Sequence, residues 1–133
     1  MEKVVILGRV STDQQNYERQ VVELTEYCCK VGWEVVETFT NKISGAETIE
    51  NRTEIMNMIK FIKENEVSRM VCLEISRLGR NTLEALKVIQ ILNEQKVSLY
   101  IKNYNLETLH PDGSVNPITS LICTILLEIA SME

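Results

Sequence analysis

The sequence has few of the residues that build metal sites and disulfide scaffolds. It contains one histidine, His110, and four cysteines, Cys28, Cys29, Cys72 and Cys123, none of them in a C-x-x-C pair. Structural zinc sites and the frameworks of small secreted domains need closely spaced sets of these side chains. We therefore expect no zinc site, reduced thiols and a cytoplasmic setting.

Long apolar runs and a basic excess are also missing. The apolar stretch in MEKVVILGRV is shorter than a signal-peptide core, and no run approaches the length of a membrane span, so we expect a soluble protein. The chain has 14 Lys and Arg residues against 19 Asp and Glu residues, and no Lys or Arg follows Lys102. Proteins that hold nucleic acid nonspecifically usually carry a basic excess. Any contact with DNA must therefore be local or depend on a segment outside this chain.

The pattern that is present is that of one α/β domain. With 133 residues, 44% of them hydrophobic, the chain can bury one ordinary core. Short apolar runs alternate with longer stretches in which apolar residues recur every three or four positions. The predicted strands cover residues 3–7, 33–39, 69–75 and 97–101, and the predicted helices cover residues 14–31, 51–63 and 81–95. This alternation predicts a mostly parallel sheet with helical crossovers.

Local capping patterns set the ends of the predicted helices. Thr12-x-x-Gln15, Asn51-x-x-Glu54 and Asn81-x-x-Glu84 resemble capping boxes. Gly32 is a stop signal for the first helix. The stretch from Asn41 to Asn51 is then predicted to be a loop.

The C-terminal stretch is apolar around most of its circumference. Asn116 and Pro117 suit a helix N-cap and a first helical position, and apolar side chains crowd residues 118–132. The pattern fits either a central core helix or a helix that packs on its own domain with one face and on a partner chain with the other. We expect an α/β domain over residues 1–114 and, over residues 115–133, the start of a long helix that this chain cuts.

Arg9 and Ser11 lie at the junction of the first predicted strand and the first predicted helix. In open α/β sheets, ligands bind at the carboxyl ends of the parallel strands, and a helix start attracts anions. The guanidinium group of Arg9 suits a phosphate or a carboxylate. The pair indicates a phosphate-handling site; the alternative is that Ser11 helps the turn and Arg9 is a surface charge.

A second basic cluster follows the third predicted strand. The block Ser76-Arg77-Leu78-Gly79-Arg80 lies at the same sheet edge as Ser11 if the strands are parallel, and Arg52 follows the loop after the second strand. A serine without a histidine partner does not suit an acyl-transfer triad. Several guanidinium groups around one hydroxyl suit phosphoryl transfer, in which charge develops on non-bridging oxygens.

Together these motifs resemble the catalytic domain of the serine recombinases, the resolvase and invertase family. In chain order the resemblance is carried by Arg9-Val10-Ser11-Thr12, Gln20, the loop from Asn41 to Gly45, Arg52, Ser76-Arg77-Leu78-Gly79-Arg80 with Asn81-Thr82, and Thr124-Ile125-Leu126. It spans nearly the whole chain. It implies a resolvase-like three-layer α/β domain with a mostly parallel central sheet of four or five strands and a long C-terminal dimerisation helix.

The resemblance also implies a reaction. Ser11 would attack a DNA phosphodiester to give a 5′-phosphoserine link and a free 3′-OH, the cleavage step of site-specific recombination by resolution, inversion, integration or transposition. The residues that would hold the scissile phosphate are Arg9, Arg77 and Arg80. The residues that would support them are Arg52 and Gln20, with Ser76 and Asn41 as further candidates.

The same resemblance implies partners. The substrate would be double-stranded DNA. No metal ion, cofactor or external energy source would be required. The C-terminal helix would join chains into dimers, and the dimers would meet as tetramers during strand exchange. Family members commonly append a DNA-binding region after this helix, so we expect that region to lie beyond Glu133. The acidic charge balance therefore predicts weak DNA binding by this chain alone.

The sequence departs from the family pattern near both basic clusters. Leu7 and Gly8 stand where members often carry an aromatic residue and alanine, and Ser76 stands where many carry aspartate. The identity of a general acid or base is therefore open. A serine only donates or accepts a hydrogen bond at working pH, so we expect Ser76 to position its neighbours.

Other functions stay open on the residues alone. A receiver-like or flavodoxin-like binding module would share the general fold. Such a module would need acidic residues at the ends of the first and third strands, or a phosphate-binding loop for a cofactor. A metal-dependent nuclease or phosphatase would have to use Glu74 and Asp13, and a two-metal site needs more carboxylates. A catalytically idle assembly domain would keep the fold without the reaction.

The aromatic residues and one C-terminal tetrapeptide have ordinary structural interpretations. The tyrosines and the single tryptophan are too dispersed in the sequence to predict a stacking platform for single strands: Tyr17, Tyr27, Trp33, Tyr100 and Tyr104. His110-Pro111-Asp112-Gly113 is predicted to be a turn.

Overall fold

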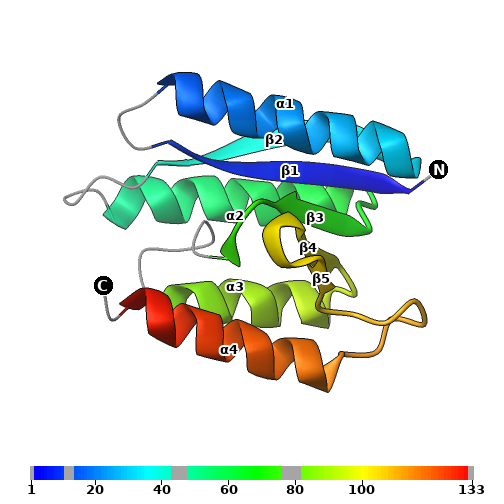
Figure 1. Cartoon of the computed structure of the whole chain (residues 1–133), viewed down its shortest axis with the longest axis vertical. Coiled ribbons are helices and arrows are strands. Elements are labelled where there is room, and N and C mark those ends of the chain that lie inside the picture. The colour runs from blue at the N-terminus through cyan, green and yellow to red at the C-terminus, as the bar shows by residue number, and fades with distance from the viewer. Residues whose placement is uncertain (1, 11–13, 43–47, 76–81, 132–133) are drawn as a thin grey trace.

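The computed structural model describes residues 2–10, 14–42, 48–75 and 82–131 (Figure 1). In chain order its elements are β1 (Lys3–Val10), α1 (Gln14–Val31), β2 (Glu34–Lys42), α2 (Thr48–Glu64), β3 (Arg69–Cys72), α3 (Thr82–Glu94), β4 (Ser98–Ile101), the 3-10 helix η2 (Lys102–Tyr104), β5 (Leu106–Glu107) and α4 (Pro117–Ser131). No helix in these ranges is both long enough and apolar enough to cross a lipid bilayer.

The five strands form one sheet in the order β2-β1-β3-β4-β5. β1, β2, β3 and β4 run parallel, as the alternation of strands and helices predicts. β5 runs antiparallel to β4, with Tyr100 opposite Glu107 and Ile101 opposite Leu106. This two-residue strand carries no sequence signal of its own, because it is too short to show an alternation.

Side-chain alternation along β1 divides the molecule into three layers. Val4 and Ile6 are buried on one face of the sheet, in a cluster with Leu24 and Cys28 of α1. Val5 and Leu7 are buried on the opposite face, in a cluster that includes residues of α2, α3 and α4. Figure 1 shows α1 on one side of the sheet and α2 on the other, with α4 beside α3. A strand that is buried on both faces has a continuous run of apolar residues in its sequence. The run KVVIL therefore predicts a buried strand at β1.

The first helix has the bounds that its periodicity predicts and ends at Gly32. This glycine has φ +86°, a left-handed conformation that costs an L side chain energy. The amide of Gly32 donates to the carbonyl of Cys29 at 3.2 Å, and the amide of Trp33 donates to the carbonyl of Cys28 at 2.8 Å. This pair of bonds is the Schellman arrangement, and it satisfies carbonyls that the helix end leaves free.

The predicted start of the second helix is wrong. α2 begins at Thr48, so Asn51 lies inside the helix and does not cap it, and the predicted loop is shorter than expected. The loop is also wrong at its first residues, because Asn41 and Lys42 belong to β2. Once a helix is nucleated each added residue gains a hydrogen bond, and no residue from Thr48 to Asn51 is a glycine or proline that would stop it.

The carboxyl ends of β1 and β3 differ from the predicted bounds. In both cases the strand ends where its pairing with a neighbouring strand ends. β1 continues to Val10, and this extension gives Asn41 and Lys42 of β2 partners in Arg9 and Val10. β3 stops at Cys72, where its pairing with β1 ends at Leu7. Strand ends depend on the ladder beside them, and the sequence of one strand does not contain that information.

The C-terminal helix begins as its capping pattern predicts. The Oδ1 atom of Asn116 accepts hydrogen bonds from the amides of Ile118, at 3.1 Å, and Thr119, at 3.3 Å, and Pro117 is the first helical residue. The predicted turn before it is confirmed, since the amide of Gly113 donates to the carbonyl of His110 at 2.9 Å. Hydrogen bonds from Ser114 lower the pKa of Asp112 in this turn.

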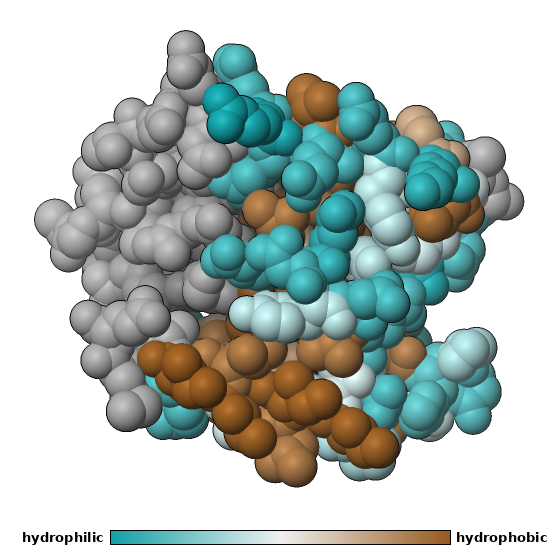
Figure 2. All heavy atoms as spheres, viewed as in Figure 1, coloured by the Kyte–Doolittle hydropathy of each residue, from teal (hydrophilic) through white to brown (hydrophobic). Residues whose placement is uncertain are grey.

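The helix α4 has one buried and one exposed apolar face, so the central core-helix interpretation is wrong. Thr119, Cys123 and Leu127 are at most 4% exposed and face the domain. The residues on the outer face are apolar and 49–69% exposed: Ile118, Leu121, Ile125 and Ile129. Figure 2 shows this strip of hydrophobic surface along α4.

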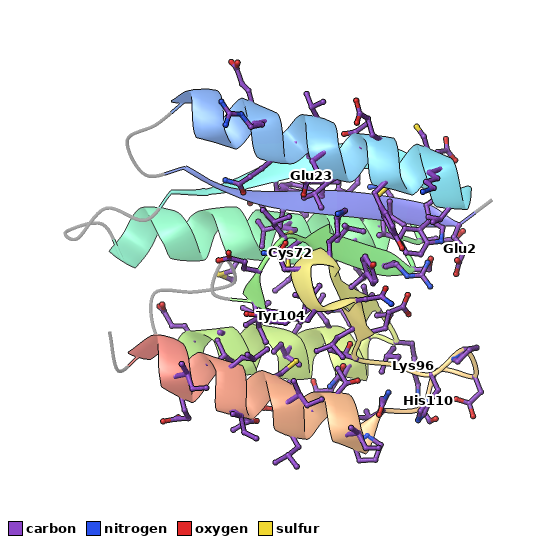
Figure 3. All side chains as sticks on the ribbon, viewed as in Figure 1. Glu2, Glu23, Cys72, Lys96, Tyr104 and His110 are labelled. Carbon is purple, nitrogen blue, oxygen red and sulfur yellow. The ribbon has the colours of Figure 1, made fainter. Side chains whose placement is uncertain are left out.

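An ion-pair network joins β1, β3 and β5 at the edge of the sheet where the parallel strands begin. Arg69 at the start of β3 donates to Glu2 at 2.7 Å and to Glu107 of β5 at 3.1 Å, and its guanidinium group stacks 4.1 Å from the ring centre of Trp33. Figure 3 labels Glu2 at this end of the molecule. Arg69 is 12% exposed, so the network is screened less than a surface pair and ties β5 to the sheet.

Replacing Asn116 by alanine should destabilise the domain by about 1 kcal/mol, because two amides of the first turn of α4 lose their acceptor. Urea unfolding followed by circular dichroism measures the change. Asn116→Asp is the control, since its carboxylate can accept the same bonds and should keep the stability. An alanine variant as stable as the wild type would contradict the cap.

Candidate functional site

Two of the predicted site residues lie where β1 and β2 end. Arg9 of β1 is paired with Asn41 of β2, and both lie at the carboxyl ends of adjacent parallel strands. β3 ends beside Leu7, so Ser76, four residues after Cys72, follows a strand that points to the same edge. Figure 1 shows these strand ends, and the amino ends of α1, α2 and α3, on the left of the molecule.

The structure describes the predicted site residues to different extents. Gln20 is described in full, on the second turn of α1. The residues whose backbone is placed but whose side chains lie outside the description are Arg9, Asn41 and Arg52. The residues that lie wholly outside the described ranges are Ser11, Ser76, Arg77 and Arg80, together with the predicted caps at Thr12 and Asn81. The sheet register therefore brings Arg9 and Asn41 together as neighbours, and Arg52 lies in the first half of α2.

Gln20 has an unusual environment for an amide. Its side chain is 5% exposed, and neither the amide nitrogen nor the amide oxygen has a hydrogen-bond partner among the described residues. A buried amide without a partner costs free energy, so such groups in native proteins usually bond to something. Gln20 lies in the first half of α1, the helix that follows the carboxyl end of β1.

The chain segment that leads from β3 to Ser76 is held in place by η2. The amide of Asn103 donates to the carbonyl of Leu73 at 3.1 Å, and the Nδ2 atom of Asn103 donates to the carboxylate of Glu74 at 3.3 Å. Ile75 is 3% exposed and packs in the main core. Glu74, a candidate metal ligand in the nuclease alternative, thus has a hydrogen-bonding role; Asp13, the other candidate, lies outside the described residues.

Three of the four cysteines lie in the packing of the domain, and Cys29 is exposed. All four are free thiols, and Cys28, Cys72 and Cys123 are buried. Burial raises the pKa of Cys28 and of Cys123 to about 11, so both stay protonated at neutral pH. A thiol is a nucleophile only as the thiolate, so these two side chains serve the core.

Three aromatic residues come together although the sequence suggests that they are dispersed. Tyr27 and Tyr100 stack with ring centres 5.3 Å apart, and Trp33 meets them edge-on at 5.9 and 5.5 Å. Their spacing along the chain gave no indication of this cluster. Trp33 directly follows the Gly32 helix end, which turns it back over α1, and no pattern local to one segment reveals that Tyr100 meets it there.

Comparisons with known proteins agree on one family. The model of the family "Resolvase, N terminal domain" matches residues 4–133. A resolvase from Clostridium perfringens is 28% identical over 127 residues, which are 95% of this chain and 61% of the relative. The transposon Tn917 resolvase of Enterococcus faecalis is 27% identical over 101 residues, which are 76% of this chain and 50% of the relative. The chain thus spans about half to three fifths of the length of these curated relatives.

A solved structure agrees with the fold. The N-terminal catalytic domain of TP901-1 integrase is 27% identical to this chain and superposes with a TM-score of 0.71, covering 98% of this chain and 95% of that domain. The resemblance in the motifs, the three-layer fold with its C-terminal helix, and the family match over nearly the whole sequence point the same way. The chain belongs to the resolvase N-terminal domain family.

Proposed function

We propose that this chain is the catalytic domain of a site-specific DNA recombinase, in which Ser11 cleaves and rejoins DNA by transesterification. The observation that carries the proposal is the family match over residues 4–133. The sheet supports it, because Arg9, two residues before Ser11 in the sequence, lies at the carboxyl end of β1. That edge is where ligands bind in this class of fold.

The reaction balances without an external reactant. The oxygen of Ser11 attacks the scissile phosphorus, the bond to the 3′ oxygen breaks, and that oxygen leaves with a proton as the 3′-OH while the 5′-phosphate stays on the serine. In the reverse step a 3′-OH attacks the phosphoserine and releases the serine hydroxyl. The number of phosphoester bonds is unchanged, so rejoining needs no energy source.

Arginine side chains supply the electrostatic part of this proposal. Charge that develops on the non-bridging oxygens is stabilised by cations already in position. We assign this work to Arg9, Arg77 and Arg80, with Arg52 in support. A guanidinium group offers two parallel donors to a phosphate and is always charged, which suits a site that works without a metal ion.

The polar residues of the site have positioning roles in this proposal. The buried amide of Gln20 lacks a partner among the described residues, so it is available to the turn that carries Ser11 or to the bound phosphate. Asn41 is the strand partner of Arg9 and aligns with it at the edge. Ser76, at the end of the segment that Asn103 holds, donates or accepts one hydrogen bond and leaves proton transfer to water.

The partner that fits this chemistry is duplex DNA, bound weakly by this chain alone. The net charge is −5, and the chain has no Lys or Arg after Lys102, so phosphate contacts must concentrate at the proposed site. Self-association is part of the proposal as well. Four large apolar side chains are exposed along α4, and a second copy placed against this strip would form the dimer from which a tetramer assembles.

Changing Ser11 to alanine in the full-length protein should abolish both cleavage and the covalent adduct on DNA that carries its recombination site, since the attacking oxygen is gone. Denaturing gels detect the adduct. The wild type should still cleave in excess EDTA, and Ser114→Ala, at the far end of the domain, should behave as the wild type. An adduct that survives in Ser11→Ala, or cleavage that requires Mg²⁺, would refute the assignment.

Changing Gln20 to leucine tests whether its amide is kept for function. Replacing a buried unpaired amide by an apolar group of similar size should leave the free energy of unfolding equal or higher, while cleavage slows by roughly tenfold. Gln90→Leu, on the exposed side of α3, is the matched control and should change neither quantity. A destabilised Gln20→Leu variant with wild-type cleavage would show a structural role.

Changing Leu121 to glutamate should weaken self-association at least about tenfold, because a carboxylate would be buried against the partner's apolar strip. Sedimentation equilibrium measures the dissociation constant. Val22→Glu, on the outer face of α1, makes the same change at a residue that is 55% exposed and should leave the constant unaltered. A Leu121→Glu chain that associates like the wild type would exclude this surface.

A further inference from the structure

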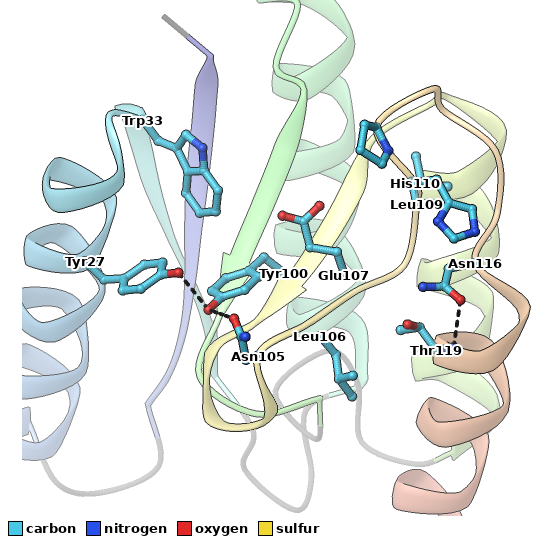
Figure 4. Close-up of a pocket in the computed structure, with 11 residues that line it drawn as sticks. Tyr27, Trp33, Tyr100, Asn105, Leu106, Glu107, Leu109, His110, Asn116 and Thr119 are labelled. Atoms are coloured by element: carbon cyan, nitrogen blue, oxygen red, sulfur yellow. Dashed lines mark hydrogen bonds between the residues drawn. The ribbon is translucent and has the colours of Figure 1, made fainter.

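A cavity of about 400 Å³ opens between α1 and the start of α4, across the strands β4 and β5 (Figure 4). None of the residues that line it is a residue of the proposed recombinase site. One wall is the aromatic cluster of Tyr27, Trp33 and Tyr100, and the other is the segment from Leu109 to Thr119. Its volume is within the range of small-ligand pockets.

The aromatic wall is fixed by hydrogen bonds. The hydroxyl groups of Tyr27 and Tyr100 are 3.0 Å apart, and the hydroxyl of Tyr100 lies 2.8 Å from Oδ1 of Asn105. The amide oxygen only accepts, so Tyr100 donates to Asn105 and accepts from Tyr27. Burial raises the pKa of Tyr100, which therefore keeps its proton. The rings present a rigid surface to the cavity.

Glu107 supplies the charge of the cavity. Its Oε1 atom accepts from Arg69 at 3.1 Å, and its Oε2 atom accepts from Ser98 at 3.1 Å and from Arg69 at 3.5 Å. Each carboxylate oxygen can accept more than one hydrogen bond, and 31% of this side chain is exposed, so acceptor capacity remains. Figure 4 shows the carboxylate between Trp33 and the His110 side of the cavity.

The charge balance around the cavity favours a cation. Glu2 and Glu107 both bind Arg69, so this network carries two negative charges and one positive charge. No Lys or Arg lines the cavity. Lys102 lies 5.6 Å from the ring centre of Tyr27, and its ammonium group is 3.8 Å from the carboxylate of Glu23. The cavity therefore borders a network of net negative charge and is lined by aromatic rings, a combination that attracts cations.

The geometry points to a binding pocket for a guanidinium group on a short apolar stem. Arg69 gives an internal precedent, because its guanidinium group already stacks on Trp33 and bonds to Glu107. A planar cation of this kind stacks on an aromatic ring and forks onto a carboxylate, which a compact ammonium does less well. Leu106, Leu109 and Pro111, which also line the cavity, would cover the stem. The group can come from an arginine side chain of a polypeptide or from a free guanidine compound.

Trp33 makes the test specific, because it is the only tryptophan of the chain and lies on the cavity wall. N-acetyl-arginine methylamide, which resembles an arginine within a polypeptide, and n-propylguanidinium are titrated separately into the protein. The readouts are tryptophan fluorescence and the indole N–H resonance. Both should change saturably, whereas neutral N-acetyl-glutamine methylamide should have no effect. Tighter binding of the amide-bearing probe identifies a polypeptide source, and equal binding identifies a small molecule.

Variants locate the binding. Glu107→Gln should weaken guanidinium binding about tenfold, because a charged hydrogen bond is lost. Glu64→Gln, an exposed residue at the end of α2, makes the same charge change away from the cavity and should have no effect. His110→Glu adds a carboxylate at an exposed lining position without touching Arg69, and should tighten binding. An indole resonance that no guanidinium probe moves, equal affinity in Glu107→Gln and wild type, or unchanged affinity in His110→Glu would each overturn the proposal.

Discussion

The burial of β1 on both faces is the constraint on which the rest of the structure depends. Val4, Val5, Ile6 and Leu7 are at most 1% exposed, and β1 pairs with β2 on one side and β3 on the other. A one-residue slip of this strand would exchange the side chains of its two faces, so its register is strongly specified. The same register decides which residues reach the carboxyl edge, and Arg9 is among them.

The two ends of the sheet use arginine differently. At the amino end, Arg69 is shielded from solvent and paired with Glu2 and Glu107, so its charge stabilises the contacts between strands. At the carboxyl end, Arg9 follows the buried part of β1 directly and is assigned to a phosphate in the proposed reaction. An acidic chain can thus concentrate positive charge at one edge, where a negatively charged substrate would need it.

The helix α4 has one face packed on the core and one face open to a partner. Cys123 and Leu127 pack into the main core, so the position of the helix follows that of α3 and the sheet. Its opposite face carries the exposed apolar strip. A partner bound there would therefore contact an element that packs directly on the core, and a small shift of the helix would be transmitted to it, because close-packed interiors transmit strain.

The sequence by itself determined the order of strands and helices, the bounds of α1, the cap at Asn116 and the motifs that predict the site, because these depend on neighbouring residues. The tertiary structure decided the start of α2, the strand β5, the exposed face of α4, the burial of the Gln20 amide, and the meeting of Tyr27 with Tyr100 and of Arg69 with Glu107. Those pairs are 73 and 38 residues apart in the chain. Their contacts arise from the packing of the whole sheet, which no local pattern encodes.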